Sequence, residues 1–195
     1  MSFRPSAVNH SLTPPTVLPI PLPFDCWSVA LTTWKLYFQA GAAEVTATLA
    51  ASGEAMLPSL SFHLETFEIK PLTASEVFEL NRRQLSYKLA MSEFWDSTAS
   101  NTKSGLPIDG IIGPVHPSAS YPHDFPSWWG HTSLWNMLDY PSTTIPVKGF
   151  EISAAADPKD MSYNPVDNAF DRACKWSSLL ISTRHTRIQL TSCAL

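Results

Sequence analysis

The stretch GLPIDGIIGPVHPSASYPHDFPSWWGHTSLWNMLDYPSTTIPV, residues 105–147, contains the signals that decide the expected fold. Residues 108–115 form a short apolar run between prolines, which predicts a buried β-strand. Residues 116–126 contain three prolines and predict an irregular loop, because proline interrupts both helices and central strands.

A helix and a second strand are predicted after this loop. Ser127 is a good N-cap for a helix over residues 128–138, which Pro141 stops. Residues 143–147 are rich in β-branched side chains and predict the second strand. Two buried strands joined by a helix are expected to be parallel with a right-handed crossover. The loop after the first strand would then lie at its carboxyl end, where open α/β sheets usually place their ligands.

Helical patterns precede this region. Asp25 is a candidate N-cap for a helix that Gly41 ends, and residues 42–51 predict a second helix that Gly53 ends. The apolar positions of the first helix recur at helical spacing and are expected in the core: Trp27, Leu31, Trp34 and Phe38.

A long helix is predicted from the sequence Thr73-Ala-Ser-Glu76, which is a capping box, as far as Ser97. Such a helix is about 36 Å long. Its apolar side chains gather near one face: Val77, Leu80, Tyr87, Met91, Phe94 and Trp95. A single apolar stripe of this length needs a broad surface to cover, and a sheet is the expected partner. The predicted fold class is therefore α/β, with long helices packed on a few strands of a mixed sheet.

The composition indicates a globular protein with a large core, since 44% of the residues are hydrophobic and 15% are charged. The net charge of −4 and the absence of a basic block argue against nucleic acid or an anionic membrane as partners. No run of 18 apolar residues is present, and the first residues lack the apolar core of a signal peptide. Three widely spaced cysteines fit reduced thiols, so a cytoplasmic location is expected.

The acidic residues divide the chain. All 17 Asp and Glu lie between Asp25 and Asp171. The preceding residues contain no acid and many prolines, and the last ones contain no acid but several basic residues. We therefore expect a body over residues 25–171, a Pro-rich N-terminal extension over 1–24 and a divergent tail over 172–195.

Four strings in this body resemble the carboxyl-terminal region of fungal amidases, the acetamidase-type members of the amidase signature family: DGIIGPV at 109–115, PHD at 122–124, WGHTSLWN at 129–136 and LDYP at 138–141. The resemblance runs from about Pro23 to about Asp171, and residues 175–195 depart from the family. It implies a carboxyl-terminal fragment of the amidase signature fold. It also implies a parent activity, the hydrolysis of carboxylic acid amides through a Ser–cis-Ser–Lys triad.

The catalytic part of that family is not found in this sequence. The resemblance places the serines in a Gly- and Ser-rich loop whose amides form the oxyanion hole, but this chain has only seven glycines and no Gly-Gly or Gly-Ser-Ser. The one Ser-x-x-Lys, Ser100 to Lys103, lies in a polar loop, where a lysine stays protonated and is a poor base. We therefore assign no catalytic residue and no cofactor. The chain is expected to be a truncated amidase-family protein, a pseudoenzyme that is inactive alone, or to hydrolyse amides only with a chain that supplies the missing half.

What remains is a predicted wall of a substrate pocket, because aromatic rings with a few polar groups suit a small amide. The matching positions are His123, Asp124, Trp129, Thr132, Trp135, Asn136 and Tyr140. The alternative is that these residues are only scaffold.

Two other kinds of role are left open. His116, His123, Asp124 and His131 lie within sixteen residues and could ligate zinc, although their spacing fits no established pattern and no metal is assigned. A sheet without its other strands would also expose edges, through which the chain could self-associate.

Overall fold

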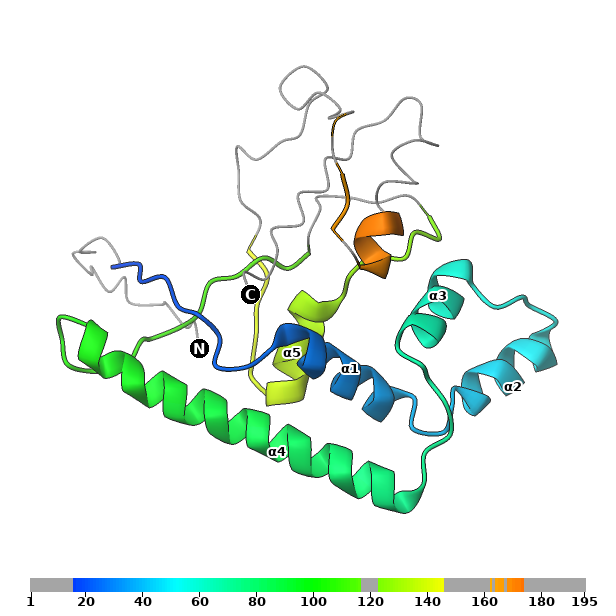
Figure 1. Ribbon diagram of the computed structural model, residues 1–195, viewed down its shortest axis with the longest axis horizontal. Helices are drawn as coiled ribbons and strands as arrows, with labels where there is room; N and C mark the ends of the chain where they lie inside the picture. Colours follow the sequence, from blue (N-terminus) through cyan, green and yellow to red (C-terminus); the bar gives the residue numbers. More distant parts are fainter. Residues whose placement is uncertain (1–15, 117–122, 146–161, 163, 167, 174–195) are drawn as a thin grey trace, which may run out of the picture.

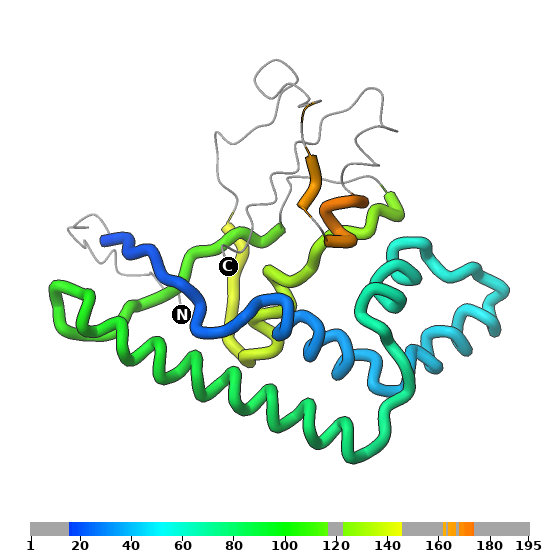
Figure 2. Tube along the Cα trace, viewed as in Figure 1, coloured from blue at the N-terminus to red at the C-terminus, as the bar shows by residue number. Residues whose placement is uncertain are grey.

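The structure is a computed structural model that describes residues 16–116, 123–145, 162, 164–166 and 168–173. The elements follow in the order α1 (Cys26–Tyr37), α2 (Ala43–Ser52), α3 (Pro58–Thr66), α4 (Ala74–Ser97), the 3₁₀ turn η1 (Thr98–Asn101) and α5 (Gly130–Leu138). Figures 1 and 2 show α4 along one side of the molecule, with α1 and α5 next to it and with α2 and α3 forming an arm.

The predicted α/β fold with a mixed sheet is wrong, because the described residues form helices and no strand. Residues 108–115 are irregular and are not part of a sheet, and Ile112 within them is 94% exposed. Residues 143–145, the described part of the second predicted strand, are not a strand either. A strand is stable only beside a neighbouring strand, and an apolar run in the sequence does not reveal whether that neighbour is present. Because the described residues form no sheet, they offer no sheet edge for the expected self-association.

The helix boundaries that depend on local capping are confirmed. The Asp25 carboxylate accepts hydrogen bonds from the backbone N–H groups of Trp27 and Ser28 and caps α1. The predicted capping box of Thr73 and Glu76 begins α4, which ends at Ser97 as expected.

The start of α5 differs from the prediction. The helix begins at Gly130, and its N-cap position is Trp129, without a side-chain cap. Ser127 is buried, and its hydroxyl oxygen accepts a hydrogen bond from the Trp129 indole N–H instead of capping the helix. Gly130 is required here, because a Cβ atom at this position would collide with the ring of Trp128. Helix α3 was not predicted, although it begins with Pro58 in the first turn, which is a favoured position for proline.

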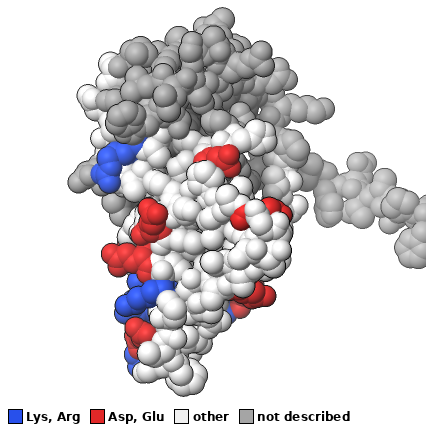
Figure 3. Space-filling model, turned by 90° about the vertical axis from the view of Figure 1, so that its right-hand side faces the viewer, with Lys and Arg blue, Asp and Glu red and all other residues white. Residues whose placement is uncertain are grey.

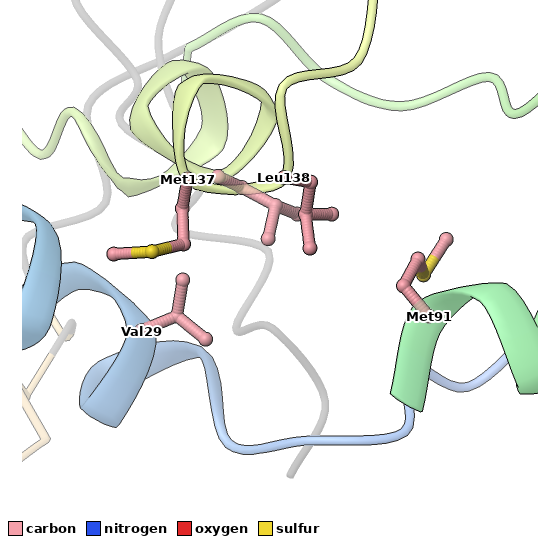
Figure 4. Close-up of a cluster of buried hydrophobic side chains, with 5 residues drawn as sticks. Val29, Met91, Met137 and Leu138 are labelled. Carbon is pink, nitrogen blue, oxygen red and sulfur yellow. The ribbon is translucent and has the colours of Figure 1, made fainter. Parts of the chain in front are cut away.

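The main core lies where α5 packs on both α1 and α4. Its buried members are Val29, Met91, Leu134, Met137 and Leu138. Figure 4 shows Met137 and Leu138 extending from α5 toward Val29 of α1 and Met91 of α4. The apolar stripe of α4 therefore covers two helices and not the expected sheet.

A second cluster lies on another side of α1, and its buried members are Ala30, Trp34, Phe67 and Phe170. The first-helix pattern is thus only partly confirmed, since Trp34 is buried but Trp27 is 40% exposed. Helix α1 contributes to both clusters, so its buried side is wider than a single stripe.

Polar contacts add to the packing of α5 on α4. The Gln84 side-chain Nε2 donates to the carbonyl oxygen of Met137 at 3.1 Å. Lys88 forms a salt bridge with Asp139, the residue after α5. Because Asp139 is largely exposed, this ion pair contributes little to stability, and the apolar contacts dominate.

The segment that contains α2 and α3 starts and ends at one crossing between α1 and α4. An isolated antiparallel bridge pairs Ala40 with Pro71. Gly41 has φ +71° there, and a Cβ atom on it would lie 2.5 Å from Pro71 Cδ. Only glycine fits this crossing without strain.

The predicted division into residues 1–24, 25–171 and 172–195 stays a prediction, because most of the two outer ranges lies outside the described residues. Leu22 and Phe24 nevertheless pack against the main core, and the Phe24 ring lies edge-on to Tyr87 with 5.5 Å between the centroids.

No helix of the described part is both long and apolar enough to cross a membrane. Most of the described surface in Figure 3 is uncharged, and the acidic and basic side chains on it are interspersed. The described residues on this face therefore form no continuous basic patch.

We predict that Met137→Ala lowers the free energy of unfolding by about 3 kcal/mol, because Met137 is 2% exposed and its removal leaves a cavity. Leu85→Ala is the matched control, since Leu85 is 55% exposed, and a change within about 0.5 kcal/mol is expected. Urea titrations followed by far-ultraviolet circular dichroism measure both. Equal losses in the two variants would contradict the assignment of the core.

Candidate functional site

The candidate site is the exposed side of α5. Trp129, Thr132 and Asn136 follow one another at intervals of three and four residues, so they lie on the same face of the helix. Trp129 is 41% exposed, and the other two are exposed as well. The buried residues of α5 are Ser133, Leu134, Met137 and Leu138. Packing of that side on α1 and α4 leaves an indole, a hydroxyl and a carboxamide facing outward.

The Asn136 side chain is held by Tyr37 at the end of α1. Its Nδ2 donates to the Tyr37 hydroxyl oxygen at 2.7 Å, although 99 residues separate the two. Tyr37 is 50% exposed and adds a phenol to the same surface. It was not predicted as a site residue, because in the sequence it lies in a helix whose pattern only indicates a core.

Trp129 is fixed by contacts on two helices. Its ring stacks on Trp34 of α1 with 5.3 Å between the centroids and on His63 of α3 with 4.8 Å. Its indole N–H donates to the Ser127 hydroxyl oxygen at 2.7 Å. The exposed part of this ring is therefore a rigid apolar platform.

His63 connects α3 to the segment that precedes α5. The side chain is fully buried, with Nδ1 at 2.6 Å from the Ser59 carbonyl oxygen and Nε2 at 2.9 Å from the Ser127 carbonyl oxygen. Carbonyl oxygens only accept, so a neutral imidazole donates to one of them and a doubly protonated ring donates to both. The ring also stacks on Trp34 at 4.8 Å. Nothing in the sequence singles out His63, because both of its polar partners are backbone atoms.

The other predicted pocket residues are placed differently. Trp135 and Tyr140 stack on each other with 6.4 Å between the centroids, and both pack against the main core. Tyr140 also meets Trp95 of α4 edge-on at 5.9 Å. This placement is typical of scaffold residues. His123 and Asp124 are exposed at the start of the loop that leads to Phe125, and Asp124 has a left-handed backbone with φ +60°.

The four residues considered for zinc do not form a site in the structure. All four are described, and no three His, Cys, Asp or Glu side chains in the described ranges group closely enough to hold a metal ion. Burial lowers the pKa of His131, and the nearby His116 lowers that pKa further. His131 is therefore favoured in its neutral form.

The Ser100 and Lys103 side chains considered for catalysis are both at the surface. The Ser100 hydroxyl donates to the Ser97 carbonyl oxygen at 2.9 Å. The Ser28 hydroxyl donates to Asp25 at 2.6 Å, within the cap of α1. The hydrogen bond from Ser28 lowers the pKa of Asp25 below its usual value, so this carboxylate is too weak a base to activate the exposed hydroxyl.

Several fungal amidases match this chain over part of their length. Amidase FG08078 of Gibberella zeae is 37% identical over 157 residues, which are 80% of this chain and 29% of that protein. Amidase 2 of Gibberella moniliformis is 30% identical over 111 residues, 56% of this chain and 21% of that protein. The acetamidase of Emericella nidulans is 30% identical over 112 residues, 57% of this chain and 20% of that protein.

The chain thus spans less than a third of the length of these relatives. No family model and no solved structure matches it. The predicted resemblance to part of a fungal amidase is confirmed.

We predict that His63→Ala lowers the free energy of unfolding by about 3 kcal/mol, because it opens a buried cavity and removes the imidazole contacts to the Ser59 and Ser127 carbonyl oxygens. It should also shift the tryptophan emission to longer wavelength, since Trp129 loses its stacking partner. The control is His123→Ala, in which an exposed imidazole is removed. If this control changed stability and emission as much, His63 would not be the anchor of Trp129.

A second prediction concerns pH. Folding lowers the pKa of His131 from 6.5, so at mildly acidic pH the imidazole is protonated to a greater extent in the unfolded chain than in the folded chain. Protonation of His131 in the unfolded chain should therefore lower the free energy of unfolding as the pH falls through about 6.5. His131→Gln should flatten the dependence of the unfolding free energy on pH between about 7.5 and 5.5, measured by urea titration. The control is His123→Gln, which removes an exposed imidazole. An unchanged slope in His131→Gln would contradict the prediction.

Proposed function

We propose that this chain forms one part of an amidase, that it supplies a wall of the substrate pocket, and that it does not hydrolyse amides on its own. The observation that carries the proposal is the 37% identity over 157 residues to a segment that makes up 29% of an amidase. The names of the relatives specify amidases and acetamidases, so an amide is the proposed class of substrate.

The exposed face of α5 supports the proposed pocket wall. An indole platform suits the apolar part of a small amide, and the hydroxyl of Thr132 and the carboxamide of Asn136 can pair with its N–H and C=O groups. Tyr37 orients Asn136, and His63 holds Trp129, so these groups are positioned before a substrate binds. In this proposal Trp135 and Tyr140 support the wall from behind, while His123 and Asp124 lie at its exposed rim.

The proposed lack of independent activity rests on chemistry. Amide cleavage requires a nucleophile that an adjacent base activates. The family resemblance assigns this role to serines of a Gly- and Ser-rich loop that has no counterpart here. In comparable hydrolase triads, loss of the nucleophile alone lowers turnover by about 10⁶-fold. An ordered pocket wall does not compensate for such a loss.

An amidase completed by another polypeptide is the second candidate, and it is favoured by the same partial match. In that case the chain would contribute to catalysis only after assembly with the rest of an amidase. The cytoplasmic location expected from the cysteines is part of both proposals.

The first test uses the chain alone. We expect no hydrolysis of acetamide or of an aryl amide, and no labelling by a fluorophosphonate serine probe. Turnover or covalent labelling of any serine would overturn the proposed inactivity.

The second test uses a chimera in which the matching 157 residues of this chain replace the corresponding segment of Amidase FG08078. We expect measurable amide hydrolysis, and we expect Asn136→Ala to lower kcat/KM by about tenfold, the effect of losing one substrate hydrogen bond. Ser86→Ala on α4 is the control and should not change kcat/KM. A folded chimera without activity would contradict the role of this segment as a working part of an amidase.

A further inference from the structure

Helix α4 has apolar side chains on two opposite faces. One face contributes Leu80 and Met91 to the packing on α1 and α5. The other carries Phe78, Leu85 and Leu89, which are 71%, 55% and 55% exposed. We call these three residues the outer stripe.

The three side chains of the outer stripe lie on the same side of α4, and the exposed Arg82 lies between Phe78 and Leu85 on that side. Intervals of seven and four residues return to the same side of a helix, so the three side chains are aligned over about 17 Å. Phe78 and Leu89 each lie two residues from a buried member of the other face, about 200° round the helix. In Figure 1, α4 has α1 and α5 on one side only.

An aligned outer stripe is unusual for a helix at the surface. A single exposed leucine is common, but surface helices normally carry polar side chains opposite their buried stripe. Apolar side chains on both sides are typical of a helix packed between two layers. The structure supplies one of these layers.

The charges beside the stripe indicate what kind of layer is missing. Arg82 and Arg83 both pair with Glu79, and Glu93 is exposed farther along the helix. A helix that binds an anionic membrane carries a mainly basic polar face, whereas these flanks carry both signs. An apolar centre with mixed polar neighbours is typical of a protein interface.

We propose that the outer stripe of α4 is the surface on which the remainder of an amidase packs. The proposal rests on the proposed function, since more than two thirds of each compared amidase lies outside the segment that matches this chain. The occupant is that remaining polypeptide, with an apolar surface complementary to Phe78, Leu85 and Leu89. The outer stripe is thus exposed in the isolated chain and buried in the complete enzyme.

The experiment compares the same substitutions in two contexts. Leu85→Lys combined with Leu89→Lys is introduced into the full 195-residue chain and into the chimera with Amidase FG08078. Ser86→Lys, at an exposed position of the same helix beside the stripe, is the matched control for added charge. Thermal unfolding is followed by circular dichroism, and the association state by analytical ultracentrifugation.

In the isolated chain, all variants should unfold within about 2 °C of the unsubstituted protein, because exposed positions tolerate lysine. In the chimera, the double substitution should lower the Tm by about 5 °C or more, because two lysines would be forced into an apolar contact. The control should leave the Tm of the chimera unchanged.

The contrary outcomes are distinct. If the chimera is folded and active but the double substitution does not change its Tm, the proposed docking surface is wrong and the proposed function is unaffected. An unsubstituted chimera that does not fold would overturn both. A dimer of the isolated chain that the double substitution dissociates would assign the outer stripe to a second copy and would also overturn the proposal.

Discussion

The structure depends on the apolar contact that Met137 and Leu138 of α5 make with Val29 of α1 and Met91 of α4. These side chains come from three helices that are far apart in the sequence. Their contact fixes which side of α5 is buried. The outward side, with Trp129 and its polar neighbours, is therefore a consequence of core packing.

The site also depends on how α3 is attached. His63 contacts the carbonyl oxygen of Ser127 and stacks on Trp129, so the position of an exposed ring is set by a buried one. Trp34 lies against both rings and links this assembly to α1. Contacts with Trp34 of α1 and His63 of α3 thus hold the exposed Trp129 in place, in addition to the packing of α5 in the main core.

The sequence predicted those features that depend on neighbouring residues. The capping box at Thr73 and the cap at Asp25 act within one helical turn, and both helix starts were correct. The strands were wrong because a strand requires a partner that an apolar run does not specify. Tyr37 and His63 were missed for a related reason, since their partners lie 99 and 64 residues away. The motifs that resemble amidases led to α5, but they did not distinguish its outward residues from Trp135 and Tyr140, which pack inward.

The bridge between Ala40 and Pro71 has a consequence for how this part of the chain can vary. Residues 41–70 start and end at this bridge. The number of residues between its two sides can therefore change without changing the distance between α1 and α4. Within this segment α2 has no buried residue, whereas α3 holds the histidine that braces Trp129. Insertions and deletions should therefore be tolerated at α2, and α3 should be constrained together with the surface it supports.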